Sequence, residues 1–225
     1  MQIVISTEIK EKFPTLCIAL LEAEVRNTEN NDCLWQEIQA TEATFRQNYT
    51  TETLKQRTSI AATRQAYRVL GKDPSRYRPS NEALVRRLLQ GKELYHINTL
   101  VDINNLVSIR HGYSIGGFDR NKIQGDKLIL GIGLANEPYE GIGRGTINIE
   151  SLPVYRDTAG GIGTPTSDNE RTKMDLDTQH ALFLINGFDG NRNAVTSCAE
   201  DLQALLAKYA QGKDFRLTVV QSQPE

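Results

Sequence analysis

The chain contains 225 residues, of which 39% are hydrophobic and 24% are charged, a balance typical of a globular protein with a packed core. Its formal net charge of −2 excludes a uniformly basic surface, so contact with nucleic acid requires a local cluster of cations. The three scattered cysteines form no CxxC pair, which argues against a zinc site or a disulfide framework.

The first residues have neither a basic segment nor a long apolar run, so we expect no signal peptide. No apolar stretch approaches the roughly 18 residues needed to cross a membrane. Together with the few thiols, this predicts a cytoplasmic protein without membrane contact. A nucleotide-binding GxGxxG in a βαβ setting, a P-loop and a His/Cys cluster are missing from the sequence, so we expect no cofactor and no metal.

In chain order, residues 2–6 and 15–25 have the β-rich composition of strands. Residues 31–49 and 57–71 then show the apolar spacing of helices, the second closed by Gly71. After a proline-marked loop, a third helix is predicted over residues 81–91, with Ser80 as its cap.

Residues 101–111 are predicted to be helical, and residues 114–117 to form a glycine-containing loop. The remaining pattern predicts strands, one long amphipathic helix and a closing strand, in the order 126–135, 145–157, 180–187, 191–212 and 215–221. This order favours an α+β fold with mixed or antiparallel sheets packed against helices. We expect either a division into residues 1–90, with arginine-rich helices, and an α+β core at residues 91–225, or a single domain.

Positive charge is concentrated between residues 55 and 92, where ten lysines or arginines accompany only two acids. Such a surface can follow a phosphate backbone, and Tyr67 and Tyr77 lie among the arginines. A solvated helical face balanced by acids elsewhere is the alternative. The residues predicted to contact RNA are Arg64, Arg68, Lys72, Arg76, Arg78, Arg86 and Arg87.

A polar row is predicted on the helix at residues 101–111, because Asn104, Ser108 and His111 have the spacing of one helical face. The glycines that follow, Gly116 and Gly117, let backbone come close to a ligand. Asparagine both donates and accepts, which suits recognition of hydroxyls and amides. The alternative is that these side chains only satisfy backbone groups and the helix dipole.

A second polar cluster follows the glycines at 160–163, and it contains Arg171, Thr172 and Lys173. These residues are able to supply a cation and a hydroxyl to a ligand held against the first cluster. By composition alone, an exposed turn whose charges aid solubility is an equal alternative.

Residues 101–119, together with segments 152–163 and 168–185, resemble the tRNA-binding and editing module of the bacterial phenylalanyl-tRNA synthetase β subunit, formed by its third and fourth B domains. The run from Tyr67 to Arg87 resembles free-standing proteins that carry this module without a synthetase core. The resemblance covers residues 60–210 in outline, and residues 1–55 are less distinctive.

The resemblance implies an editing pocket, since in the synthetase this module hydrolyses tyrosine wrongly attached to the phenylalanine tRNA. The family's D-x-T-N helix start corresponds to residues 102–105, so Asn105 keeps the family asparagine and Asn104 replaces the threonine. The pocket histidine of P-M-H-A-F-D corresponds to Gly116. The resemblance places the glutamate of G-G-x-x-S-E-V at the turn 171–174, where threonine or lysine replaces it.

Three functions are therefore considered. The first is hydrolysis in trans of a mischarged aminoacyl-tRNA, which makes tRNA or aminoacyl-tRNA the expected partner. The second is a non-catalytic RNA-binding module, and the third is a binding protein or enzyme for an amino-acid-like small molecule. The sequence leaves catalysis undecided and names no catalytic residue. All three place residues 104–117 and 171–173 around a shared cavity.

Overall fold

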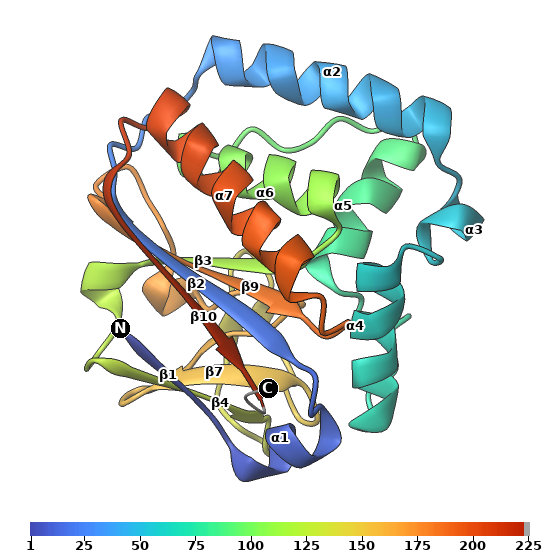
Figure 1. The fold of residues 1–225 in the computed structure, drawn as a ribbon, viewed down its shortest axis with the longest axis vertical. Helices are drawn as coiled ribbons and strands as arrows, with labels where there is room; N and C mark the ends of the chain where they lie inside the picture. Colours follow the sequence, from blue (N-terminus) through green and yellow to red (C-terminus); the bar gives the residue numbers. More distant parts are fainter. Residues whose placement is uncertain (223–225) are drawn as a thin grey trace.

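The computed structural model describes residues 1–222, so the last three residues of the predicted segment 91–225 lie outside it. Figure 1 shows three layers, with helices above one four-stranded sheet and a second four-stranded sheet below it. This arrangement confirms the predicted α+β class with mixed and antiparallel sheets packed against helices.

The central sheet has the strand order β10-β2-β9-β3, and its neighbouring strands are antiparallel. Both of its faces are buried. In β2, Ala19 and Leu21 face the helices, whereas Ile18 and Leu20 face the other sheet, as the alternation of side chains in a strand requires. Its strands are β2 (Cys17–Glu24), β3 (Ile115–Asp119), β9 (His180–Gly187) and β10 (Lys213–Gln221).

The second sheet has the order β1-β4-β7-β8, in which β1 and β4 are parallel and the other pairs are antiparallel. A small hairpin of β5 and β6 lies outside both sheets. The strands are β1 (Gln2–Ile5), β4 (Lys127–Ile132), β5 (Glu140–Gly141), β6 (Gly145–Thr146), β7 (Pro153–Asp157) and β8 (Gly160–Gly163).

The helical layer covers the central sheet, and α7 packs on β2, β9, β10 and α6 (Figure 1). None of the helices in residues 1–222 is long and apolar enough to span a bilayer. The helices are α1 (Thr7–Lys12), α2 (Asp32–Asn48), α3 (Thr51–Leu54), α4 (Thr58–Val69), α5 (Ser80–Leu89), α6 (Thr99–His111) and α7 (Arg192–Tyr209), with the 3-10 turns η1 (Arg120–Lys122) and η2 (Glu170–Thr172).

Two local predictions were wrong. Residues 115–117 are not a loop but the start of β3. Glycine has a low strand propensity, and here the backbone hydrogen bonds to β9 hold Gly116 and Gly117 in an extended conformation. Ser80 is the first residue of α5 rather than its cap, and its N–H donates to the carbonyl of Pro165 at 2.8 Å. Elements α1, α3, β5 and β8 were not predicted, and the strand expected over residues 145–157 is divided into β6 and β7.

The strands of the segment 1–90 are integral to both sheets. β2 lies between β9 and β10, and β1 pairs with β4. Helices α4 and α5 of the same segment lie beside the later chain at the end of the helical layer. The early and late parts of the chain therefore build the same layers, and this brings residues near 80, 104, 117 and 168 to one place.

Candidate functional site

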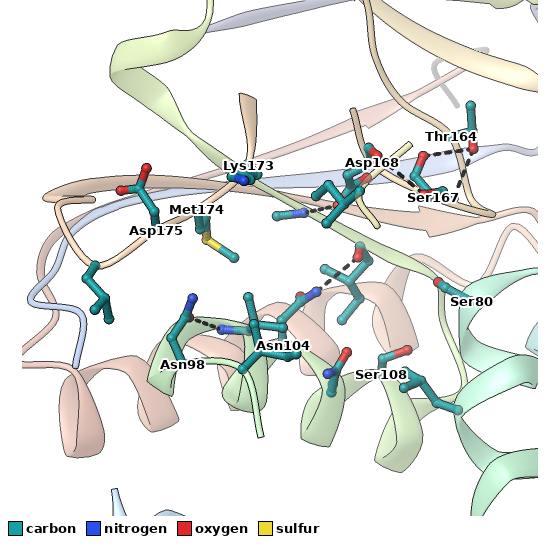
Figure 2. Close-up of a pocket in the computed structure, with 18 residues that line it drawn as sticks. Ser80, Asn98, Asn104, Ser108, Thr164, Ser167, Asp168, Lys173, Met174 and Asp175 are labelled. Atoms are coloured by element: carbon teal, nitrogen blue, oxygen red, sulfur yellow. Dashed lines mark hydrogen bonds between the residues drawn. The ribbon is translucent and has the colours of Figure 1, made fainter. Parts of the chain in front are cut away.

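A cavity of about 440 Å³ opens between α6 and the segment 164–176 (Figure 2). Residues of α6 lie on one side, and Asp168, Lys173 and Met174 lie on the other. Most of its wall is aliphatic or thioether in character, with the side chains of Leu84, Ile97, Val101, Ile115, Ile142, Met174 and Leu176.

The two distant clusters predicted from the sequence do meet here. Five of the nine residues predicted to line a pocket line this cavity, namely Asn104, Asn105, Ser108, Gly117 and Lys173. They come together because α6 packs beneath β3 and the segment 168–174 runs along the open edge of β3, where Phe118 and Lys173 form an antiparallel bridge.

Asn104 is buried, and only one end of its amide has a partner within residues 1–222. Nδ2 donates to the carbonyl of Ile115 at 3.1 Å, which ties α6 to β3. Oδ1 accepts no hydrogen bond from any described residue. A buried acceptor without a partner is costly, so this oxygen is suited to receive a donor from a ligand. By contrast, Ser108 Oγ donates to the carbonyl of Tyr113 at 2.7 Å and supports the end of the helix.

Two predicted pocket residues make polar contacts away from the cavity. His111 lies at the C-terminal end of α6 and pairs with Asp201 of α7, with 3.1 Å between Nε2 and Oδ2. Arg171 makes a bidentate contact with Asp157 at 2.8 and 3.0 Å, which holds η2 on the second sheet. Both side chains are thus used to join elements of the fold.

The other two predicted residues outside the cavity are Gly116 and Thr172. Thr172 is fully buried. Gly116 faces the second sheet, because successive strand residues alternate and Gly117 is the one that faces the cavity. A Cβ at Gly116 would lie 2.7 Å from the Phe118 ring and 3.2 Å from Oδ1 of Asp168. Close packing against Phe118 therefore requires a glycine at position 116.

The cavity also contains two acidic residues that were not predicted from the sequence, Asp168 and Asp175. Oδ2 of Asp168 accepts from the backbone N–H of Gly117 at 3.0 Å (Figure 2). Asp168 directly follows Ser167, three residues before the turn at 171–174 where the resemblance places the family's glutamate.

Burial raises the pKa of Asp168 to about 7, and the hydrogen bond from Gly117 opposes this rise only in part. The carboxyl group is therefore divided between its neutral and ionised forms near neutral pH. A carboxyl with a raised pKa in a cavity is a common feature of functional sites. On the same side of the cavity, Lys173 is half-exposed and pairs with Glu170.

The loop that carries Asp168 is fixed by the helical segment that precedes it. Thr166 Oγ1 donates to the carbonyl of Tyr77 at 3.0 Å and lies 2.8 Å from the hydroxyl of buried Tyr67. On the other side, the hydroxyl of Tyr139 donates to the carbonyl of Ser167 at 2.7 Å. Tyr67 and Tyr77 of the predicted motif thus hold the loop that carries Asp168 in place.

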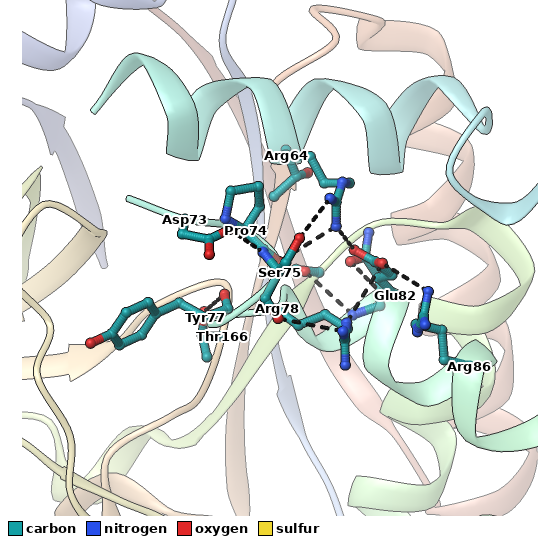
Figure 3. A network of polar contacts seen from close by, with 12 residues as sticks. Arg64, Asp73, Pro74, Ser75, Tyr77, Arg78, Glu82, Arg86 and Thr166 are labelled. Carbon is teal, nitrogen blue, oxygen red and sulfur yellow. Dashed lines mark hydrogen bonds and ion pairs between the residues drawn. The ribbon is translucent and has the colours of Figure 1, made fainter. Parts of the chain in front are cut away.

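Part of the predicted basic surface is internal. Figure 3 shows Arg64, Arg78 and Arg86 gathered around Glu82, which is fully buried. The Arg64–Glu82 contact is the closest, with 2.6 Å between Nη1 and Oε2. The buried Lys72 donates to the carbonyls of residues 148 and 150. A phosphate cannot reach a buried cation that already holds an internal acceptor, so Arg64 and Lys72 do not belong to an RNA surface.

The other predicted RNA contacts are more open. Arg68 and Arg76 are exposed. Arg87 is partly exposed and contacts the ring of Tyr95. Within residues 1–222, no three His, Cys, Asp or Glu side chains are grouped as a metal site.

Comparisons with known proteins agree with this architecture. The model of the B3/4 domain family matches residues 62–211. Among solved structures, the fold is similar to an N-terminal fragment of the phenylalanyl-tRNA synthetase β subunit from Pyrococcus horikoshii, with a TM-score of 0.53 and 13% identity. That match covers 96% of this chain and 50% of the other, so the chain spans about half the fragment's length. No curated protein matches the sequence.

Proposed function

Because the chain belongs to the B3/4 domain family and has the fold of a phenylalanyl-tRNA synthetase β-subunit module, we propose that its cavity binds the aminoacyl end of a charged tRNA and promotes hydrolysis of the ester. The observation that carries this proposal is the pair of acceptors, Asp168 and Asn104 Oδ1, in an otherwise mainly apolar cavity.

The size and chemistry of the cavity suit an aminoacyl group. A volume of about 440 Å³ is within the usual range for small-ligand sites. The α-ammonium group of an aminoacyl ester offers N–H donors to both acceptors, and the amino-acid side chain packs against Ile115 and Met174. Lys173 lines the cavity and supplies a positive charge for the phosphate that links the terminal nucleoside to the preceding nucleotide.

Hydrolysis adds water to the ester carbonyl and releases the free amino acid and the ribose hydroxyl. Fixing the ammonium group and the side chain holds the carbonyl in one orientation toward an attacking water, and such positioning supplies much of the rate in reactions of this kind. In this proposal Asp168 and Asn104 bind and orient the substrate.

A panel of mischarged tRNAs tests the function. We expect wild-type protein to deacylate at least one member, and Asp168→Asn to lower kcat/KM at least tenfold, because the charged acceptor for the ammonium group is lost. Asp177→Asn is the matched control, since Asp177 is exposed and does not line the cavity. Asn105→Ala and Lys173→Ala extend the series around the cavity. Absence of deacylation across the panel would contradict the catalytic part.

The internal use of Arg64 and Lys72 favours a second candidate, a protein that binds an amino-acid-like small molecule without RNA. Calorimetric titration with free amino acids and their methyl esters separates the two. Binding of an ester together with no salt-sensitive RNA binding supports the small-molecule candidate. Salt-sensitive RNA binding without deacylation supports a non-catalytic RNA-binding module.

A further inference from the structure

An exposed tyrosine lies close to the cavity in a fixed position. Tyr95 is 58% exposed, and the guanidinium carbon of Arg87 lies 3.7 Å from the centre of its ring. Nη1 of Arg87 also donates to the tyrosine hydroxyl at 2.8 Å, and Nε donates to the carbonyl of Glu93. The guanidinium thus covers one face of the ring, and the large exposed fraction leaves other parts of the ring open to solvent.

The chain around Tyr95 belongs to no helix or strand, yet its neighbours are anchored. Leu94 is buried, and its N–H donates to Glu42 at 3.1 Å. His96 stacks on Trp35 with 3.3 Å between ring centroids. The N–H of Ile97 donates to Asp102 at 3.2 Å. Because the residues on both sides of Tyr95 are anchored, the segment loses little conformational entropy when a ligand binds to the ring.

Tyr95 is also near the cavity along the chain. Ile97 lines the cavity, is 53% exposed and lies two residues after Tyr95, so their Cα atoms are at most about 7 Å apart. On α5, Leu84 lines the cavity, and Arg87 follows it by three residues on the same helical face. The stacked pair of Arg87 and Tyr95 therefore lies next to the rim of the cavity.

We propose that the Arg87–Tyr95 pair is a stacking platform for the terminal nucleobase of an RNA strand whose esterified ribose enters the cavity. This proposal rests on the proposed function. A flat nucleobase stacks on an aromatic ring without sequence readout, and an arginine beside the ring adds positive charge for the neighbouring phosphate. The base and the acyl ester of a terminal nucleoside are joined through a single ribose, so the proposal places the base on the rim and the ester inside the cavity.

The test measures binding of two uncharged RNA hairpins that end in a single-stranded CCA, one intact and one abasic at the last position. The loss of one stacked base corresponds to about 1–3 kcal/mol, which is about 5- to 150-fold in affinity. We expect Tyr95→Ala to weaken binding of the intact hairpin by at least fivefold and to leave binding of the abasic hairpin unchanged. Tyr95→Phe keeps the ring and is expected to retain most of the affinity, and thermal unfolding checks that each variant is folded.

Equal effects of Tyr95→Ala on the intact and abasic hairpins, or no effect on either, would overturn the platform. Deacylation by wild-type protein with unchanged KM in Tyr95→Ala also overturns it and leaves the proposed function standing. If wild-type protein neither binds the hairpins nor deacylates any tRNA, both the platform and the RNA-linked function are wrong.

Discussion

Asp168 has an environment that opposes its negative charge, and this links ligand binding to pH. Its pKa in the folded protein is about 7, above the ordinary value of 3.8. The folded state therefore binds this proton more tightly than the unfolded state. The resulting stabilisation is fully present below pH 3.8 and is lost as the pH rises through 7.

Replacement of Asp168 by asparagine is expected to remove that pH dependence. At pH 8 the variant should be more stable than wild type by on the order of 2 kcal/mol, whereas at pH 4 the two should be similar. Binding of an amino-acid methyl ester should tighten through about pH 7 in wild type and not in the variant. Urea unfolding and calorimetric titration at both pH values measure this, and parallel pH profiles for the two proteins would contradict it.

The adjacent glycines at 116 and 117 form a matched pair for a second prediction. A Cβ at Gly117 would lie 2.6 Å from the terminal methyl group of Met174, a flexible group at the cavity. Gly117→Ala should therefore move Met174, weaken ligand binding and change stability little. A Cβ at Gly116 meets the buried Phe118 ring, so Gly116→Ala should destabilise the protein by about 1–3 kcal/mol. Chemical unfolding and ligand titration compare the two, and an equal loss of stability in both would be inconsistent with this geometry.

At the scale of elements, the loop 164–168 depends on the hydroxyl of Thr166. Thr166→Val keeps the shape but removes the contacts with Tyr67 and the carbonyl of Tyr77, and should cost about 1–3 kcal/mol. Because the same loop holds Asp168, ligand affinity should fall as well, and Thr166→Ser should restore both properties. Thermal unfolding and titration provide the readouts. If Thr166→Val is less stable but binds the ligand as tightly as wild type, the hydroxyl of Thr166 does not position Asp168.

Element types were largely predictable because the apolar spacing of α2, α4, α5 and α7 is regular. The start of β3 was not, since Gly116 and Gly117 have low strand propensity and only the pairing with β9 makes them extended. Sequence spacing also brought Asn104 and Ser108 to one face correctly. It did not show that His111 reaches Asp201 or that Arg171 reaches Asp157, because those partners are distant in the chain.

At the scale of the whole molecule, the arginine-rich run has both internal and external roles. Glu82 pairs with three arginines, of which Arg64 is buried and Arg78 and Arg86 are partly exposed (Figure 3). The buried Lys72 donates to two carbonyls. Arg68, Arg76 and Arg87 remain accessible to a phosphate backbone. A count of charges along the sequence therefore overestimates the basic surface, since a count does not reveal which cations have buried partners.

This division predicts a weak salt dependence of RNA binding. With about three accessible cations, the slope of log K against log salt concentration should be about −2, whereas all seven predicted contacts would give about −5. Fluorescence anisotropy with a labelled hairpin across a range of salt concentrations measures the slope. A slope near −5 would mean that Lys72 and the arginines paired with Glu82 also become available to RNA.

The central claim is that Asp168 and Asn104 receive an aminoacyl group in the cavity between α6 and segment 164–176. A crystal structure with an adenosine that carries an amide-linked, non-hydrolysable aminoacyl group tests it most directly. We predict the ammonium group within hydrogen-bond distance of Asp168 and of Asn104 Oδ1, with the amino-acid side chain against Met174. A ligand bound at another surface, or a cavity that stays closed to it at saturating concentration, would contradict the claim.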